Sequence, residues 1–443
     1  MADTREPLGV ALVGCGTVGG AVATILTRDQ SILAARLTPR IALRCIVDID
    51  FAHARECGLD EALFCEDLGE ALADPAVGVV VELVGGTTVA RDIIADALRA
   101  GKHVVTANKA LLAHHGAALY ALAREHGVSV SFEASCAGGV PIIRALCDGL
   151  IANRIDAIYG IVNGTCNFIL TEMTQHERSY ADALAAAQAA GLAEADPTLD
   201  VSGTDSAHKL AVMAALAFGQ RVDLEEIPVD GIDALQPCDV GYGQELGYVI
   251  KLLAIAHRQG GGISLRVRPA FIPKDHPLAW ISGPFNAISV YGHATGHTMY
   301  YGRGAGGMPT ASAVVADLAS VASGTAGRRF AQLALWPDLN ASASQLPVDD
   351  VESRYYIRVA AEDKPGVFAR IATVLGGHDI SIASALQHEP TDADPAAGVP
   401  VVITTHRARE GNVRSAIAEI NALPVIKAET VCIDMVDEHP EQM

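Results

Sequence analysis

The sequence lacks the basic excess and the long apolar runs that mark several large classes of protein. Its formal net charge is −20 at pH 7, so the average surface repels nucleic-acid backbones and anionic membranes. No stretch reaches the roughly 18 uninterrupted apolar residues of a membrane span, and the polar start MADTREPLGV has no signal-peptide core. These absences predict a cytoplasmic protein that binds a small molecule, with no nucleic acid and no membrane as partner.

Paired cysteines and aromatic residues are also scarce. The nine cysteines are scattered singly, with no C-x-x-C pair, which argues against a disulfide framework and a zinc site. Aromatic residues make up 5% of the chain and hydrophobic residues 50%, so the core is built from Ala, Val and Leu. Because 443 residues exceed one ordinary core, we expect two or three domains.

The first third of the chain alternates short Val- and Ile-rich runs with Ala-rich helical stretches. This cadence predicts an α/β fold with a Rossmann-type doubly wound parallel sheet. We expect a dinucleotide-binding domain over residues 1–135, completed by 303–335. The expected strands lie at 9–16, 41–50, 79–86, 103–108 and 128–135.

The pattern changes after about residue 136. Residues 136–302 combine helices with strand-like runs and predict an α+β catalytic and dimerisation domain with a largely antiparallel sheet. Residues 336–353 are polar and aperiodic, which is typical of a linker. Residues 354–436 have the order βαββαβ of a small ferredoxin-like unit.

A glycine-rich loop follows the first expected strand. Gly14, Gly16 and Gly19 have G-x-G-x-x-G spacing between a strand and a helix, which is typical of a loop that cradles a pyrophosphate. A glycine-rich loop without a ligand is the alternative. Asp48 ends the second strand and favours NAD through the ribose hydroxyls, whereas Arg55 nearby suits the 2′-phosphate of NADP.

An acidic stretch precedes an apolar helix in GLAEADPTLDVSGTDSAHKLAVMAALAFG, residues 191–219. Capping residues at 202–204 predict a helix that places Asp205 and Lys209 one turn apart on one face. Such a pair is most often solvated, but the helix has almost no polar face, which favours a pocket. On the same face we expect buried side chains at Val212, Met213 and Leu216.

Two further stretches hold candidate site residues. Lys109 follows the strand at 103–108, where open α/β sheets bind ligands; a solvated loop lysine is the alternative. Glu133 is the second residue of the loop FEASCAGGVP, residues 132–141. Its carbonyl oxygens suit a hard cation, although the residues alone favour a simple strand-to-helix connection.

Several motifs, taken in order, resemble the homoserine dehydrogenase family over residues 8 to 325, and the tail with DKPGVFARIATVL resembles an ACT domain. The resemblance implies reversible, NAD- or NADP-dependent interconversion of L-homoserine and L-aspartate 4-semialdehyde, a step towards threonine, isoleucine and methionine. The motifs are GCGTVGG, VELVGGTT, VVTANKALLA, FEASCAGGVPII, GIVNGTCNFIL, GLAEADPTLDVSGTDSAHK and YGRGAGGMPTASAVVADL.

The resemblance also implies roles for individual residues. Lys209 is implied as general acid/base and Lys109 as the second lysine at the substrate or cofactor, with Glu194, Asp205 and Asp200 around the substrate. The implied cofactor residues are Gly14, Gly16, Thr17, Val18, Gly19, Asp48, Thr87, Lys109 and Gly306. A structural sodium ion is implied at Glu133, Cys136, Gly138 and Val140.

The resemblance further implies a homodimer or homotetramer and an amino-acid effector, usually threonine, at the ACT unit. We expect the effector at the loop 362–367, near Asp363 and Gly366. The acidic insertion HEPTDADPAAGVP (388–400) departs from the family pattern, as does VDID at the end of the second strand, which puts NADP preference in doubt.

Two other functions remain as alternatives. An ACT-tailed 2-hydroxy-acid dehydrogenase needs an arginine, an acid and a catalytic histidine near the cofactor, and no such set follows the later glycine motifs. A non-catalytic sensor of nucleotide and amino acid is the other alternative, and the presence of both Lys109 and Lys209 counts against it.

Overall fold

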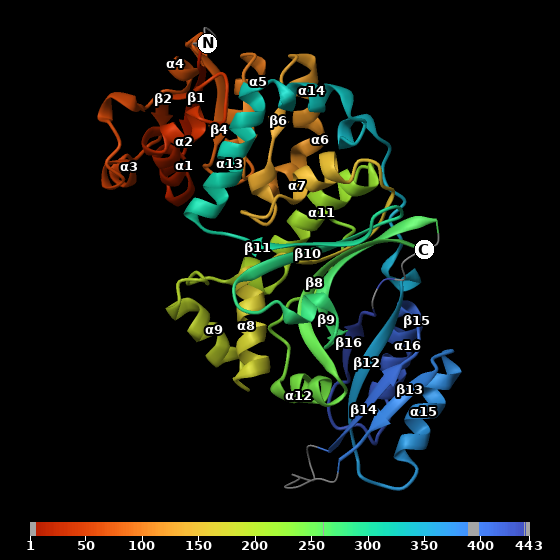
Figure 1. Cartoon of the computed structure of the whole chain (residues 1–443). Helices are drawn as coiled ribbons and strands as arrows, with labels where there is room; N and C mark the ends of the chain where they lie inside the picture. The colour runs from red at the N-terminus through yellow and green to blue at the C-terminus, as the bar shows by residue number, and fades with distance from the viewer. Residues whose placement is uncertain (1–5, 260, 389–397, 438, 440–443) are drawn as a thin grey trace.

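Two β-sheets organise the chain, a parallel one near the N-terminus and a mixed one that runs through the rest (Figure 1). The computed structural model describes residues 6–259, 261–388, 398–437 and 439. Most of the insertion at 388–400 lies outside them. Among the described residues, no helix has the length and apolar character needed to cross a membrane.

The parallel sheet has six strands in the order β3-β2-β1-β4-β5-β6. Its helices cover both faces, so the predicted doubly wound Rossmann fold is confirmed. The elements are β1 (Leu8–Val13), α1 (Thr17–Arg28), α2 (Gln30–Ala34), β2 (Ile41–Val47), α3 (Ala52–Glu56), β3 (Phe64–Cys65), α4 (Leu68–Ala73), β4 (Val77–Glu82), α5 (Val89–Arg99), β5 (His103–Thr106), α6 (Lys109–Glu125) and β6 (Val130–Ser131).

The last strand of this sheet is shorter than the run at 128–135 predicts. Only Val130–Ser131 is a strand, and Glu133–Ser135 forms a 3₁₀ turn. The N–H of Glu133 donates to the Asp317 carboxylate at 2.8 Å, in place of a ladder bond to β5. The chain therefore leaves the sheet one turn before the loop with the predicted cation ligands.

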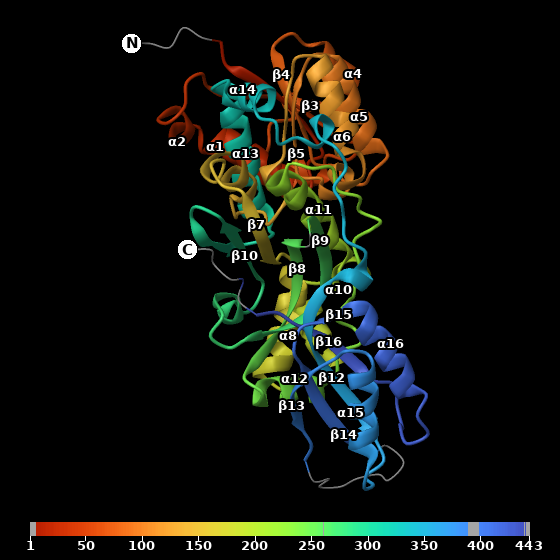
Figure 2. The same cartoon turned by 90° about the vertical axis from the view of Figure 1, so that its right-hand side faces the viewer.

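Two helices return to the parallel sheet from much later in the sequence. α13 (Gly307–Ala322) packs beside α1, and α14 (Thr325–Gln332) follows it (Figures 1 and 2). Val314 and Leu318 of α13 share one buried core with Val22 and Leu26 of α1. The N-terminal end of α13 thereby lies next to the glycine-rich loop.

The second sheet begins with five antiparallel neighbours in the order β11-β10-β7-β8-β9. The antiparallel middle sheet is thus present as predicted. Its elements are α7 (Ile142–Arg144), β7 (Ile155–Ile161), α8 (Gly164–Gln175), α9 (Tyr180–Ala189), α10 (Thr198–Val201), α11 (Thr204–Phe218), α12 (Pro237–Glu245), β8 (Tyr248–Gln259), β9 (Gly262–Pro273), β10 (Phe285–Gly292) and β11 (Gly296–Arg303).

The C-terminal unit has the predicted βαββαβ order, and its strands lie in the order β16-β12-β14-β13. β16 also pairs in parallel with β9, so the two sheets join into one of ten strands. The unit therefore shares a sheet with the middle of the chain. Its elements are β12 (Glu352–Ala361), α15 (Val367–Gly377), β13 (Ile382–Leu386), β14 (Val399–Thr405), β15 (Ala408–Arg409), α16 (Glu410–Asn421) and β16 (Val431–Met435).

The segment 336–353, predicted as a linker, is fastened along the middle of the molecule. The indole of Trp336 is buried, and the N–H groups of Arg221 and Ile263 donate to the carbonyls of Ala341 and Ser344, both at 2.9 Å. The strand β12 already begins at Glu352. These contacts limit the freedom of the C-terminal unit relative to the middle sheet.

Buried opposite charges bridge the line where β9 meets β16. Arg268 on β9 contacts Glu410 at 2.9 Å, Asp434 at 3.1 Å and Asp230 at 3.2 Å. The neighbouring Arg266 donates to the other oxygen of Asp434 at 3.1 Å. Because Arg266, Arg268, Glu410 and Asp434 are all buried, replacing one of them by an uncharged residue would leave its partner unpaired in the interior, which is strongly unfavourable.

Candidate active site

The glycine-rich loop has the shape that a bound pyrophosphate requires. Gly14 has φ +92°, and a Cβ on Gly19 would lie 2.0 Å from the Gly14 carbonyl oxygen, so both positions need glycine. A Cβ on Gly16, in contrast, would meet nothing within 4 Å. The N-terminus of α1 is therefore open to an anion at Gly16, where free N–H groups and the helix dipole favour phosphate.

Asp48 lies in the loop after β2 and connects it by a hydrogen bond to the glycine-rich loop after the neighbouring strand β1. One carboxylate oxygen accepts from the N–H of Cys15 at 2.6 Å, and the other accepts from the N–H of Ile49 at 2.7 Å. Arg55 instead pairs with Glu61 at 3.1 Å and lies over the Phe64 ring. Of the two residues considered for the ribose end of the cofactor, Asp48 is the one that contacts the glycine-rich loop.

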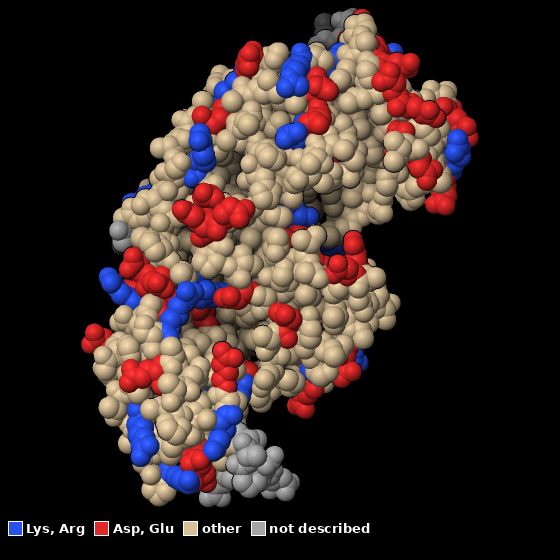
Figure 3. Space-filling model, turned by 180° about the vertical axis from the view of Figure 1, so that it is seen from behind, with Lys and Arg blue, Asp and Glu red and all other residues tan. Residues whose placement is uncertain are grey.

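A cavity of about 410 Å³ lies between the parallel sheet and the helices of the middle domain. Seen from behind, the molecule is hollowed between the upper lobe and the lobe below it (Figure 3). The lining includes the ends of β4 and β5, as expected for an open α/β sheet. The lining residues are Val18, Glu82, Leu83, Gly85, Gly86, Ala107, Asn108, Lys109, Ala110, Glu194, Asp196, Pro197, Leu199, Asp200, Asp205 and His208.

Asp205 is the central polar group of this cavity. One of its oxygens accepts from the Lys209 ammonium at 2.7 Å, and the other lies 3.1 Å from the Lys109 ammonium. The amide of Asn163 donates to Asp205 at 3.0 Å and to Asp200 at 2.8 Å. Two lysines from different domains therefore share one carboxylate.

The local sequence explains why these groups meet. Gly203 caps the start of α11 with φ +86°, and Gly219 ends the helix with φ +60°. The face of α11 predicted to be buried is buried at Val212, Met213 and Leu216. Lys109 is the first residue of α6, whose N-terminus is capped by the Asn108 side chain.

The charges of this group reinforce one another. Burial alone would raise the pKa of Asp205, but the charges of Lys209 and Lys109 and hydrogen bonds from Lys209 and Asn163 hold it well below its usual range. Burial likewise opposes the charge on Lys109, but Asp205 outweighs it and raises the lysine pKa. At neutral pH Asp205 is ionised and Lys109 is a cation.

The two lysines differ in their access to the cavity. Lys109 lines it directly, whereas Lys209 lies behind Asp205 and also donates to the Val162 carbonyl at 2.7 Å. Because an ammonium has three N–H donors, Lys209 keeps one for another acceptor. It is buried rather than directed into bulk water.

The other predicted substrate and cofactor residues lie around the same region. Glu194 and Asp200 line the cavity, as does Val18. Thr17 is the first residue of α1. A Cβ on Gly307 would lie 3.1 Å from the carbonyl oxygen of Thr17, so Gly306, the residue before it, is close to the start of α1. Thr87 lies in the turn after β4 and is not among the lining residues.

Sequence reasoning missed three polar residues of the site. Asn163 caps α8 by accepting from the Cys166 N–H at 2.8 Å, which a helix-start pattern indicates, but its contacts to Asp200 and Asp205 need the fold. His208 lines the cavity, and burial lowers its pKa. Glu82 is fully buried and accepts from the Thr106 hydroxyl at 2.6 Å.

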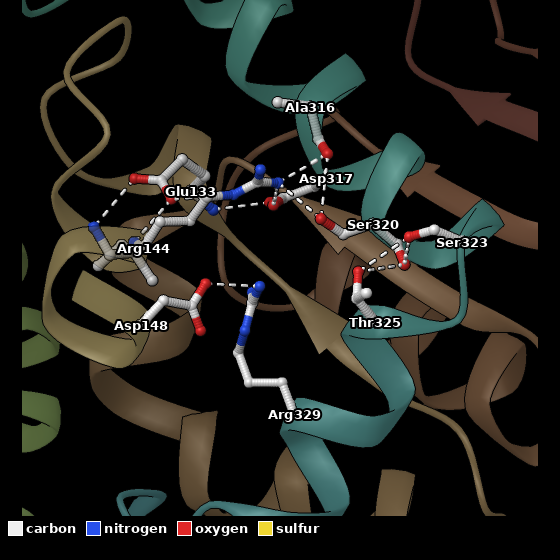
Figure 4. Close-up of polar contacts among 10 residues, drawn as sticks. Glu133, Arg144, Asp148, Ala316, Asp317, Ser320, Ser323, Thr325 and Arg329 are labelled. Carbon is white, nitrogen blue, oxygen red and sulfur yellow. Dashed lines mark hydrogen bonds and ion pairs between the residues drawn. The ribbon is translucent and has the colours of Figure 1, made fainter. Parts of the chain in front are cut away.

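Glu133, the predicted cation ligand, lies in a second polar cluster (Figure 4). Its two oxygens accept the N–H groups of Ile143 and Arg144, both at 2.9 Å. The Arg144 guanidinium lies 3.0 Å from Asp317 and 3.7 Å from Glu133. Burial, and to a smaller extent Asp317, raises the pKa of Glu133 to about 7, although the N–H bonds and Arg144 oppose this.

The other predicted cation ligands follow in a tight loop. Ala137 and Gly138 both have positive φ, +55° and +48°, which turns the chain sharply after Cys136. The carbonyl of Val140 accepts the Ile142 N–H at 2.8 Å. Within the described residues, no group of three or more His, Cys, Asp and Glu could hold a metal, so a cation here depends on carbonyl oxygens.

Comparisons with known proteins agree along the whole chain. Residues 14–133 match the NAD-binding domain of homoserine dehydrogenase, residues 141–319 match the homoserine dehydrogenase family, and residues 355–425 match the ACT domain. A Pseudomonas aeruginosa homoserine dehydrogenase is 44% identical, over 97% of this chain and 98% of that protein.

Solved structures give the same answer. A homoserine dehydrogenase from Thiobacillus denitrificans is 42% identical with a TM-score of 0.91, over 98% of this chain and 99% of that one. A hyperthermophilic archaeal homoserine dehydrogenase in complex with NADPH is 25% identical with a TM-score of 0.59, over 71% of this chain and 97% of that one.

The contrast between Gly16 and Gly19 gives a test of the cofactor loop. Gly16→Ala should keep the melting temperature, because its Cβ meets nothing, but weaken NADH binding at least about tenfold by blocking close backbone approach. Gly19→Ala should lower the melting temperature as well, since its Cβ overlaps the Gly14 carbonyl. NADH fluorescence titration and thermal unfolding measure the two effects. Unchanged NADH affinity in Gly16→Ala would place the cofactor elsewhere.

Proposed function

Since this chain belongs to the homoserine dehydrogenase family, we propose that the cavity around Asp205 is where it interconverts L-homoserine and L-aspartate 4-semialdehyde. The supporting observation is the ionised Asp205 shared by two lysines, beside the open glycine-rich loop. The family match favours this reaction over the 2-hydroxy-acid dehydrogenase and the non-catalytic sensor.

We propose that Lys209 is the general acid/base. A nicotinamide cofactor bound at the glycine-rich loop supplies or accepts the hydride at the substrate carbon. Lys209 gives a proton to the aldehyde oxygen during reduction and takes it back during oxidation, through the N–H that neither Asp205 nor Val162 uses. Asp205 keeps this ammonium in place.

The remaining polar groups orient the substrate in this proposal. Glu194 and Asp200 line the cavity and face the substrate ammonium, while Lys109 contacts the substrate or the cofactor. Holding the reactants together in this way contributes on the order of 7–11 kcal/mol to lowering the barrier. Orientation therefore accounts for much of the proposed rate enhancement.

We propose NAD as the preferred cofactor. The carboxylate of Asp48 is fixed beside the loop by the Cys15 N–H, where it suits ribose hydroxyls and repels a 2′-phosphate. Arg55 is engaged by Glu61. The archaeal relative forms a complex with NADPH, so the preference of this chain is tested with both cofactors.

A sodium ion is proposed at Glu133 with the carbonyls of Cys136, Gly138 and Val140. Two buried carboxylates, Glu133 and Asp317, share one guanidinium there, so the cluster has anionic capacity for a further cation. The ion would steady the connection between the parallel sheet and α7. Its contribution is structural, because the chemistry uses the lysines.

Regulation and assembly complete the proposal. An amino acid such as threonine is proposed to bind the ACT unit and inhibit the enzyme, and the antiparallel middle sheet is proposed to pair in a homodimer or homotetramer. At the loop 362–367, Glu362 pairs with Lys364 at 2.8 Å and Lys427 at 2.6 Å, and Asp363 is exposed. Asp363 is thus available to an effector ammonium.

The roles of the lysines are tested by single substitutions. Lys209→Ala should lower kcat by roughly 10²–10⁴ while cofactor affinity stays nearly unchanged, because only proton transfer is lost. Lys109→Ala should act mainly on KM for homoserine or the cofactor. Initial rates at 340 nm measure both variants. If Lys109→Ala abolishes kcat while Lys209→Ala retains it, the two roles are exchanged.

Cofactor preference is tested on the same assay. The wild type should show kcat/KM for NAD at least about tenfold above that for NADP, because Asp48 carries the same charge sign as the 2′-phosphate. Asp48→Ser should narrow this ratio, mainly through KM for NADP. A matched control is Asp60→Ser, whose side chain caps a 3₁₀ turn away from the loop. A wild type that prefers NADP contradicts the proposal.

A further inference from the structure

A second cavity lies where the middle sheet meets the ACT unit, and we call it the seam cavity. It has a volume of about 230 Å³ and is lined by side chains from both units. Tyr159 and His257 come from β7 and β8, and Glu352 and Arg354 come from β12. A cavity of this size suits a ligand of only a few non-hydrogen atoms, since drug-sized ligands occupy larger pockets.

Among the described residues, Arg258 and Arg407 of the seam cavity make no ion pair, but Arg258 already donates to the Ile155 carbonyl at 3.0 Å. Arg266 pairs with Asp434 at 3.1 Å and Arg354 pairs with Asp437 at 2.7 Å. Arg407, between β14 and β15, makes no hydrogen bond or ion pair with the part of the chain that the structure describes. Its guanidinium therefore offers a complete set of donors to an anion.

Buried polar atoms without partners lie in the same wall. The Nδ1 atom of His257 and the Oε1 atom of Gln259 are buried and have no hydrogen-bond partner among the described residues. Burial, followed by the charges of Arg266, His439 and Arg407, lowers the pKa of His257 to about 3. The neutral ring has one N–H donor and one acceptor, and leaving such atoms unpaired costs stability.

We propose that the seam cavity binds a small α-amino acid, whose carboxylate contacts Arg407 and His257. The lining has two acidic side chains, Glu352 and Asp437. Asp437 is paired with Arg354 at 2.7 Å, whereas Glu352 is 4.0 Å from Arg409, so Glu352 is the proposed contact of the ligand ammonium. This inference rests on the proposed amino-acid regulation and gives it a binding site distinct from the loop 362–367. An oxyanion such as acetate or phosphate shares the carboxylate chemistry and would occupy the Arg407 end alone.

The position of the cavity connects this ligand to the active site. Its wall includes Arg266, whose partner Asp434 also holds Arg268. Arg268 pairs with Asp230, and the Asp230 N–H donates to Val267 at 2.8 Å. The Ile232 N–H then donates to Val201 at 2.9 Å, at the end of α10 and just before the helix that carries Asp205. A ligand that stabilises the contacts between the middle sheet and the ACT unit would therefore also affect the segments that position Asp205.

Calorimetric titration of the full chain with L-threonine, acetate and inorganic phosphate tests the inference. Arg407→Gln should weaken threonine binding at least about tenfold, because a charge-assisted hydrogen bond is lost. Arg370→Gln is the matched control, since this exposed arginine on α15 is outside the cavity lining. Thermal unfolding checks that both variants fold, which we expect because Arg407 is exposed.

Several outcomes distinguish failure of the seam-cavity proposal from failure of the proposed amino-acid regulation. Threonine could bind Arg407→Gln as tightly as the wild type but bind Asp363→Asn more weakly. This result would overturn the proposed seam-cavity site and would place feedback regulation at the loop 362–367. If acetate and phosphate bind the wild type and lose affinity only in Arg407→Gln, the seam cavity is supported as a site. If threonine in addition has no effect on the reaction rate, the proposed regulation is overturned. No binding of any of these anions to the wild type contradicts the seam cavity.

Discussion

The candidate active site depends on one carboxylate held between two ammonium groups. Asp205 contacts Lys209 from its own helix and Lys109 from the parallel sheet domain, at 2.7 Å and 3.1 Å. In the partly buried cavity these attractions are stronger than in water, and they keep Asp205 and Lys109 in their charged forms. The contact between Lys109 and Asp205 also joins the two lobes.

The rest of the architecture supports that contact from both sides. Glycines at 14 and 19 let α1 approach the sheet closely, and the open position at Gly16 leaves room for a pyrophosphate. In the middle domain, Gly203 lies at the start of α11, next to the loop whose Asp230 pairs with Arg268. The shared ten-stranded sheet joins the ACT unit to β9, and Arg268 of β9 contacts both Glu410 of that unit and Asp230 of this loop.

Local patterns predicted most of the fold, because strand and helix periodicity and glycine spacing are properties of neighbouring residues. The parallel sheet, α11 with its caps, and the βαββαβ order follow from such patterns. The joining of β16 to β9 does not, since only two residue pairs, Asp434 with Ala270 and Met435 with Phe271, make it. Asn163 and the seam cavity also escaped prediction, because their partners are distant in sequence.

The pH dependence of kcat and of kcat/KM for an Asp205→Asn variant tests the central claim most directly. This substitution keeps the shape of the side chain and removes its charge, so Lys109 loses the carboxylate that chiefly offsets its burial. We predict that kcat falls by roughly 10²–10³ and that the basic limb of the kcat/KM profile moves to lower pH, because Asp205 no longer raises the pKa of Lys109. A variant with the rate and profile of the wild type would contradict the claim.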